Sequence, residues 1–155
     1  MSPHAPERMH GFTLVELVVV IVILALVSAI AGPRFFDRTA FEGRGFYDET
    51  VSAVRYAQKL AVATGCTVRV SITATGFALF RAAAAATCNT APFDTPVTDP
   101  SRPGVNFSRT APDGVTLTAA DFTFAAVGSA SANVTVNVGT RAFQVLAATG
   151  FVQAP

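Results

Sequence analysis

The sequence has few of the residues that enzymes use for proton transfer and nucleophilic attack. Only two histidines occur, His4 and His10, and both lie near the start of the 155-residue chain. Removal of the first residues as a leader would leave no histidine, which excludes Ser-His-Asp and Cys-His catalysis and zinc sites built on imidazole. The sequence also has no glycine-rich phosphate loop. We therefore expect no enzyme activity and no cofactor.

Charged residues are scarce as well. They make up 14% of the chain, below the usual value of about a quarter, and the formal net charge is +1. The net charge does not change when Glu7 and Arg8 are removed, so the chain lacks the basic footprint of a nucleic-acid-binding protein. A surface with so few charges is expected of a protein that shares its surface with other subunits.

Several aspartates of the second half lie in or beside predicted loops, namely Asp94, Asp99, Asp113 and Asp121. Their spacing matches no metal-binding loop, and aspartate is common in turns, where it is solvated. We favour the interpretation as turn residues. A pair of these carboxylates acting as in a periplasmic hydrolase remains a distant alternative.

The chain has two cysteines, Cys66 and Cys88, and no Cys-x-x-Cys motif. If the chain is exported to an oxidising compartment such as the periplasm, an even number of cysteines favours a disulfide. The bond would close the loop between the two residues and contribute about 3 kcal/mol in the chain-entropy model. Two buried free thiols are the alternative.

One apolar run dominates the N-terminal part of the chain. From Leu17 to Ala31 no residue is charged, and Ser28 is the polar exception. About 20 residues, from Phe12 to Ala31, would span roughly 30 Å of hydrocarbon as a helix. Such a segment requires a membrane or a tightly packed bundle around it.

Glu16 is the anomaly of this segment. A carboxylate in a membrane helix costs up to about 2.5 to 3.5 kcal/mol at the bilayer centre and less near an end, and such residues are usually paired. Cleavage between Gly11 and Phe12 would create an α-amine one helical turn from this carboxylate, which also complements the positive helix N-terminus. Cleavage at this position would therefore provide Glu16 with a partner.

The run from Gly11 to Glu16, followed by an apolar helix and Pro33, resembles the class III signal of type IV pilins and type II secretion pseudopilins. The resemblance implies that a prepilin peptidase cleaves after Gly11 and N-methylates Phe12. It also implies that Glu16 neutralises the N-terminal amine of a neighbouring subunit during filament assembly. The protein would be a single-pass inner-membrane protein with its C-terminal head in the periplasm, and would enter a filament with other pilin or pseudopilin subunits.

Two other interpretations of the N-terminal segment stay open. Ala29-Ile30-Ala31 has the small-x-small form of a signal-peptidase site, which would release a soluble secreted or periplasmic binding module near Ala31. Alternatively, the segment is a plain membrane anchor in which Glu16 is a tolerated interfacial charge. The basic residues on the two sides of the run do not decide its orientation. Neither interpretation accounts for the residues around Gly11.

The pattern of the rest of the chain predicts a helix followed by strands. Tyr47, Val51, Val54, Ala57 and Ala61 recur with helical period and should form one buried face, ended by the C′ glycine at position 65. We expect a leader at 1–11, a transmembrane and assembly helix at 12–32, the periplasmic half of the helix at 33–65 and an antiparallel β head at 66–155.

Within the head, alternation predicts a hairpin of 66–73 and 77–81, and prolines predict a long surface loop over 82–104. Later strand candidates are 104–109, 115–117, 121–125, 133–138 and 141–146. A long N-terminal helix packed on an antiparallel β-sheet is an α+β fold, which is also the pilin architecture.

This layout is similar to the GspH/FimT-type minor pilins and pseudopilins, including MSHA-type members with a cysteine after the helix. Some DNA-uptake members of that group have a basic tail after the last glycine, whereas Gly150 is followed here by Phe151, Val152 and Gln153. The resemblance therefore implies a structural filament subunit, and we expect no nucleic-acid partner.

Overall fold

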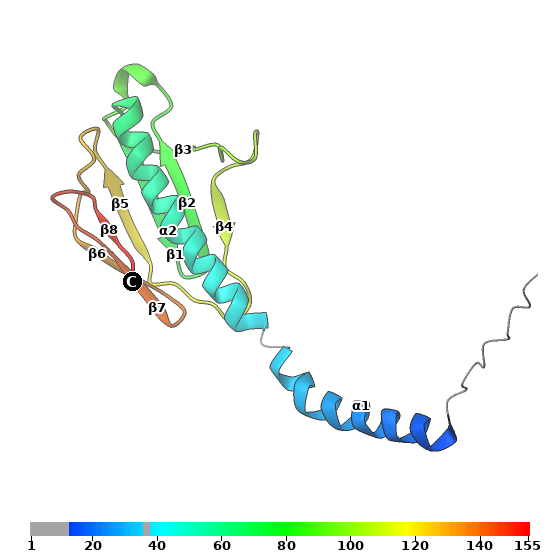
Figure 1. Ribbon diagram of the computed structural model, residues 1–155. Helices are drawn as coiled ribbons and strands as arrows, with labels where there is room; N and C mark the ends of the chain where they lie inside the picture. Colours follow the sequence, from blue (N-terminus) through cyan, green and yellow to red (C-terminus); the bar gives the residue numbers. More distant parts are fainter. Residues whose placement is uncertain (1–12, 36–37) are drawn as a thin grey trace, which may run out of the picture. The chain divides into compact units, whose positions relative to one another are not determined.

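The computed structural model describes the backbone of residues 13–35 and 38–155, and the side chains of 13–28 and 41–155. The predicted leader at 1–11, the expected cleavage site and Phe12 lie outside the described residues. The chain divides after Arg38 into two compact units. The first contains the helix α1, and the second contains most of the helix α2 and all of the strands (Figure 1).

Helix α1 spans Leu14–Phe35 and continues through Gly32 and Pro33. Every side chain described for it, from Leu14 to Ser28, is exposed. Among the residues that the structure describes, no helix combines the length and the hydropathy needed to cross a membrane.

Helix α2 spans Arg38–Thr64 and is amphipathic. Its buried face consists of Phe46, Tyr47, Thr50, Val51, Ala53, Val54, Ala57 and Ala61. The five residues expected on this face from the helical period are all among them. The three alanines have no exposed surface, and their small side chains let the helix approach the strands closely.

The C-terminus of α2 has the geometry predicted for a glycine-terminated helix. Gly65 has a φ of +66°, and the N–H of Cys66 donates to the carbonyl oxygen of Ala61 at 3.2 Å. This bond, five residues back, is typical of a Schellman motif with glycine at C′. The chain leaves the helix here and enters the first sheet.

The first sheet is antiparallel and has the strand order β3-β2-β1-β5, with β4 also paired to β2. Its strands are β1 (Val68–Thr73), β2 (Gly76–Arg81), β3 (Thr95–Pro96), β4 (Ser108–Thr110) and β5 (Ala120–Phe124). The predicted hairpin is β1 and β2, which begins later than Cys66. Pro96 lies in an edge strand, where its missing N–H leaves no ladder bond unmade.

A second antiparallel sheet has the order β6-β7-β8, from Val134–Val138, Arg141–Val145 and Val152–Gln153. The sequence predicts a single sheet, and the structure corrects this to two. It also corrects the candidate at 115–117, which contributes only an isolated bridge between Leu117 and Val138. The candidate at 104–109 is shortened to β4, because residues before Ser108 form turns and a second isolated bridge.

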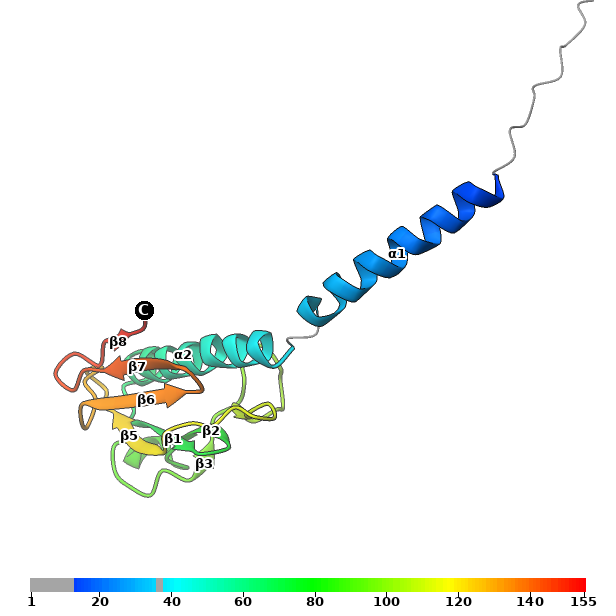
Figure 2. The same cartoon turned by 90° about the horizontal axis from the view of Figure 1, so that it is seen from below.

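The two sheets and α2 enclose one core, and α2 lies along both sheets (Figure 1 and Figure 2). The largest fully buried apolar side chains of this core are Tyr47, Phe124, Phe143, Leu79 and the valines 54, 68, 70, 136, 138 and 145. Tyr47 of α2 packs edge-on to Phe143 of β7, with ring centroids 6.3 Å apart. The fold is therefore the predicted α+β arrangement of a helix packed on antiparallel strands.

Candidate functional site

The N-terminal motif lies at the start of α1, where Thr13 caps the helix. The N–H of Glu16 donates to Thr13 Oγ1 at 3.2 Å, and the N–H of Leu17 donates to the carbonyl oxygen of Thr13 at 3.2 Å. Threonine followed three residues later by glutamate is the sequence of a capping box. Glu16 thus lies in the first helical turn with an exposed side chain, next to the segment that holds Gly11 and Phe12.

The side chains that follow Glu16 form an apolar surface on all sides of α1. The exposed fraction is 59% for Leu17, 55% for Ile21 and 62% for Leu26, and no described apolar side chain of this helix is buried. A helix that is apolar all round is normally enclosed by protein or lipid. The part of α1 that the structure describes therefore presents a surface suited to an apolar environment.

In the head, the Cys66–Cys88 disulfide joins the C-terminal end of α2 to the loop after β2. Asn89 strengthens this junction, because its Oδ1 accepts from the N–H of Thr67 at 2.8 Å and its Nδ2 donates to the carbonyl oxygen of Gly65 at 3.0 Å. The two cysteines predicted to pair are therefore bonded, and the loop is tied to the helix end by both covalent and hydrogen bonds.

A network of charged side chains anchors the proline-rich loop to α2. Asp99 is buried and accepts hydrogen bonds from Ser101 and Arg102 of its own loop and from Arg109 Nη2 of β4 at 2.6 Å. Arg109 Nε also binds Glu49 Oε1 of α2. One guanidinium thus bridges two carboxylates that are far apart in the sequence.

The two carboxylates of this network differ in their pKa. The hydrogen bonds from Ser101, followed by those of Arg102, lower the pKa of Asp99 below its ordinary value. Desolvation raises the pKa of Glu49, and the charge of Arg102 opposes this shift. Asp99 is thus held as an anion within a ring of donors, which is the environment of a structural ion pair.

The other candidate aspartates are not brought together as an acid pair. Asp121 binds the guanidinium of Arg69 across β1 and β5, and this bond lowers the pKa of Asp121. Asp94 and Asp113 are exposed. Among the described residues, no group of three histidine, cysteine, aspartate or glutamate side chains is placed to hold a metal ion.

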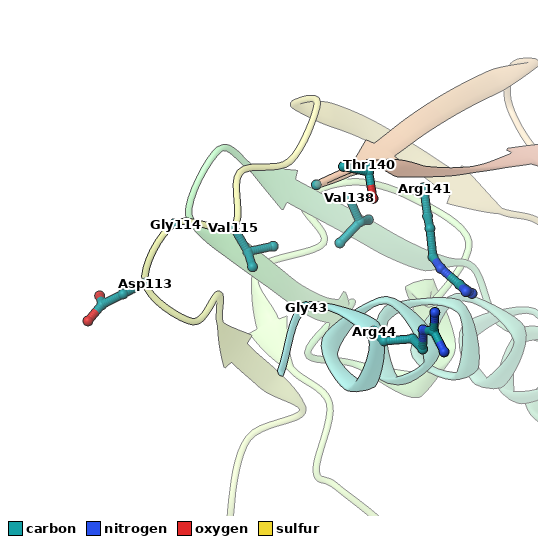
Figure 3. Close-up of a pocket in the computed structure, with 9 residues that line it drawn as sticks. Gly43, Arg44, Asp113, Gly114, Val115, Val138, Thr140 and Arg141 are labelled. Carbon is teal, nitrogen blue, oxygen red and sulfur yellow. The ribbon is translucent and has the colours of Figure 1, made fainter. Parts of the chain in front are cut away.

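A pocket of about 350 Å³ opens between the N-terminal part of α2, the loop before β5 and the turn from β6 to β7 (Figure 3). It is lined by Gly43, Arg44, Asp113, Gly114, Val115, Val138, Gly139, Thr140 and Arg141. The sequence did not indicate this pocket, because its lining comes from three segments that only the fold brings together.

Residues 8–32 match the model of a prokaryotic N-terminal methylation motif. The chain is also 48% identical over 54 residues to a type IV narrow pilus major component, PilA5, of Thermus thermophilus. That match covers 35% of this chain and 47% of the relative, so the alignment spans about half the length of the relative. No solved structure matches the chain at a significant level.

These matches agree with the residues from which the resemblance was first drawn. The methylation motif includes Gly11, Phe12 and Glu16, and the structure adds a helix that is capped by Thr13, begins at Leu14 and holds Glu16 in its first turn. Later in the chain, a second helix is packed on antiparallel strands. In this N-terminal motif and in this architecture, the chain is similar to type IV pilins.

Proposed function

We propose that the chain is a minor pilin or pseudopilin, a structural subunit of a type IV pilus or type II secretion filament. A prepilin peptidase cleaves it after Gly11 and methylates Phe12. Residues 12–32 hold it in the inner membrane by a single pass, with the head in the periplasm, until the same segment packs among other subunits. Glu16 then binds the N-terminal amine of a neighbouring subunit.

The observation that carries this proposal is the combination of Glu16 with the helix that follows it. Apolar side chains are exposed all round the described part of α1, and the carboxylate lies in its first turn, within the matched methylation motif. A filament gives the apolar side chains an environment of other helices, and it gives the carboxylate a cationic partner. A plain anchor accounts for the apolar surface alone.

The assignment as a minor subunit rests on the layout of the head. The helix end at Gly65 is followed by a disulfide-bonded cysteine, a hairpin and short strands, as in the GspH/FimT-type proteins that the sequence resembles. The matched relative is named as a major component, so the abundance of the subunit in its filament is the quantity to measure. A ratio well below one copy per major subunit is expected.

Intact mass and N-terminal sequencing of the protein from membranes test the processing step. We expect a mature chain that begins with N-methylated Phe12, and a Gly11→Leu variant that keeps its leader and stays out of filaments. Gly45→Leu is the matched control, since a Cβ atom at this exposed position meets nothing within 4 Å. A mature chain beginning at Gly32 would contradict the proposal and support the released module.

A further inference from the structure

The pocket in Figure 3 has two arginines at its rim. Arg44 projects from α2 and Arg141 from the start of β7, and their side chains point toward one another, whereas Asp113 points away from them. Both arginines are exposed. Two guanidinium groups placed together repel each other, so an anion between them would relieve the repulsion.

Neither arginine has an anionic partner within the described part of the chain. The ion pairs there involve Arg69, Arg102 and Arg109, each with at least one carboxylate. Arg44 and Arg141 take part in none of them. Among the residues that the structure describes, their positive charges are therefore not compensated by an ion pair.

Arg141 is nevertheless held in place. Its guanidinium lies over the ring of Tyr47, 5.5 Å from the centroid. Tyr47 is itself buried, and its hydroxyl donates to the carbonyl oxygen of Ala142 at 3.0 Å. The cation–π contact therefore positions the guanidinium before any ligand arrives, which lowers the entropy cost of binding.

Glycines keep the pocket open. A Cβ at Gly43 would lie 3.3 Å from Val115 Cγ2, and Gly114 and Gly139 have φ values of +80° and +58°. Side chains at these three positions would narrow the pocket or strain its walls. The glycines thus leave space for one short chemical group, and the two arginines favour a group with negative charge.

We propose that this pocket receives a single carboxylate from a neighbouring subunit. The planar fork of arginine matches a carboxylate in two parallel hydrogen bonds. An anionic membrane surface is recognised by clusters of about four to eight basic residues, and nucleic acid by a basic stripe, whereas this pocket has two arginines in a chain of net charge +1. The source of the carboxylate rests on the proposed filament function.

The test is the amount of full-length protein recovered in sheared filaments. We expect Arg44→Gln and Arg141→Gln each to reduce it about tenfold, because a hydrogen bond to a charged group is lost. Arg141→Lys should restore only part of it, since lysine keeps the charge but lacks the fork. Arg81→Gln, at an exposed arginine outside this pocket, is the matched control and should assemble normally.

Arg141 also covers Tyr47, so its substitution could destabilise the head itself. The unfolding temperature of each variant therefore separates a loss of contacts with a neighbouring subunit from a loss of stability. A photo-crosslinking residue in place of Thr140, on the pocket rim, should then capture an acidic peptide of another subunit. Normal filament levels of both glutamine variants would overturn the proposal. Binding of free acetate or phosphate to the pocket with unchanged assembly would also overturn it, as an adventitious ion only.

Failure of this proposal is distinguishable from failure of the filament function. If the chain is not a filament subunit, the wild-type protein and Arg81→Gln will also be absent from filaments. If only the pocket proposal is wrong, all arginine variants will assemble as the wild type does.

Discussion

The two helices of this protein differ in the burial of their apolar side chains. In α1 the apolar side chains are exposed, from 44% for Val18 to 79% for Leu14. In α2 one face is buried, and its Ala53 and Ala57 have no exposed surface, although Phe41 and Val62 of the same helix are exposed. Helix α2 thus packs against the strands of its own unit, whereas the described apolar side chains of α1 are exposed.

The carboxylates of the two helices follow the same division. Glu49 of α2 binds Arg109 of the same chain, while Glu16 of α1 takes part in no ion pair among the described residues. A carboxylate without an ion pair among the described residues is the one we expect to find its partner in an assembly. Substitutions in α1 should therefore affect assembly, and substitutions in α2 should affect folding.

The largest effect is expected for Glu16. Loss of one partner of a desolvated ion pair costs about 3 to 5 kcal/mol, so Glu16→Ala should lower incorporation into filaments at least a hundredfold at unchanged membrane levels. The unfolding temperature of the head should not change. Quantification of the protein in sheared filaments and in membranes measures both fractions. Glu42→Ala, an exposed carboxylate of α2, is the control.

Glu16→Gln separates charge pairing from helix capping. Glutamine serves at the third position of a capping box, so this variant keeps the cap made with Thr13 but loses the charge. We expect it to assemble as poorly as Glu16→Ala. Normal assembly of Glu16→Gln would assign the residue to the cap and remove the main support for the pairing with a neighbouring amine.

The largest effect on folding is expected for Tyr47 of α2. Tyr47→Ala removes a buried ring and its hydrogen bond to Ala142, and should lower the free energy of unfolding by about 3 to 5 kcal/mol. Phe41→Ala, on the same helix but 80% exposed, should change it by less than about 0.5 kcal/mol. Denaturant unfolding measures the difference. Equal effects at the two positions would contradict the burial pattern of α2.

Removal of the disulfide should have a smaller effect on folding. The double variant Cys66→Ser and Cys88→Ser should lower the free energy of unfolding by about 2 to 4 kcal/mol, because the unfolded chain regains loop entropy. Thiol labelling under denaturation checks the wild type, in which we expect no free thiol. Two labelled thiols in protein isolated from the periplasmic side would contradict the bond.

The smallest effect is a change of stability with pH. The folded state lowers the pKa of Asp99 below 3.8, so its contribution is present above the unfolded pKa and is lost as the pH falls through the folded value. Glu49, whose pKa is raised above 4.5, has the opposite sign: its contribution is present below the unfolded pKa and is lost as the pH rises through the folded value.

Unfolding measured from pH 7 to pH 2.5 tests these signs. Asp99→Asn should be less stable at pH 7 and should lose less stability below about pH 4 than the wild type does. Glu49→Gln should keep the acid-induced loss that belongs to Asp99. If Asp99→Asn loses as much stability at low pH as the wild type does, other carboxylates determine this loss.

Local patterns were sufficient for several parts of this protein. The helical period placed the buried face of α2, a glycine with positive φ ended that helix at Gly65, and strict alternation placed the hairpin of β1 and β2. The motif from Gly11 to Glu16 indicated a pilin-like protein before any fold was known. Each of these signals depends on residues within a few positions of one another, where backbone geometry and side-chain period act directly.

Contacts between distant segments were decided only by the tertiary structure. The division of the strands into two sheets depends on which edges meet. The bridge from Arg109 to Asp99 and Glu49 links an edge strand, a loop and a helix. The facing arginines at positions 44 and 141 likewise come from segments far apart in the chain. The partners of an ion pair leave no periodic pattern in the sequence. The energy of the pair depends on the distance between the two charges, which is set only when the core packs.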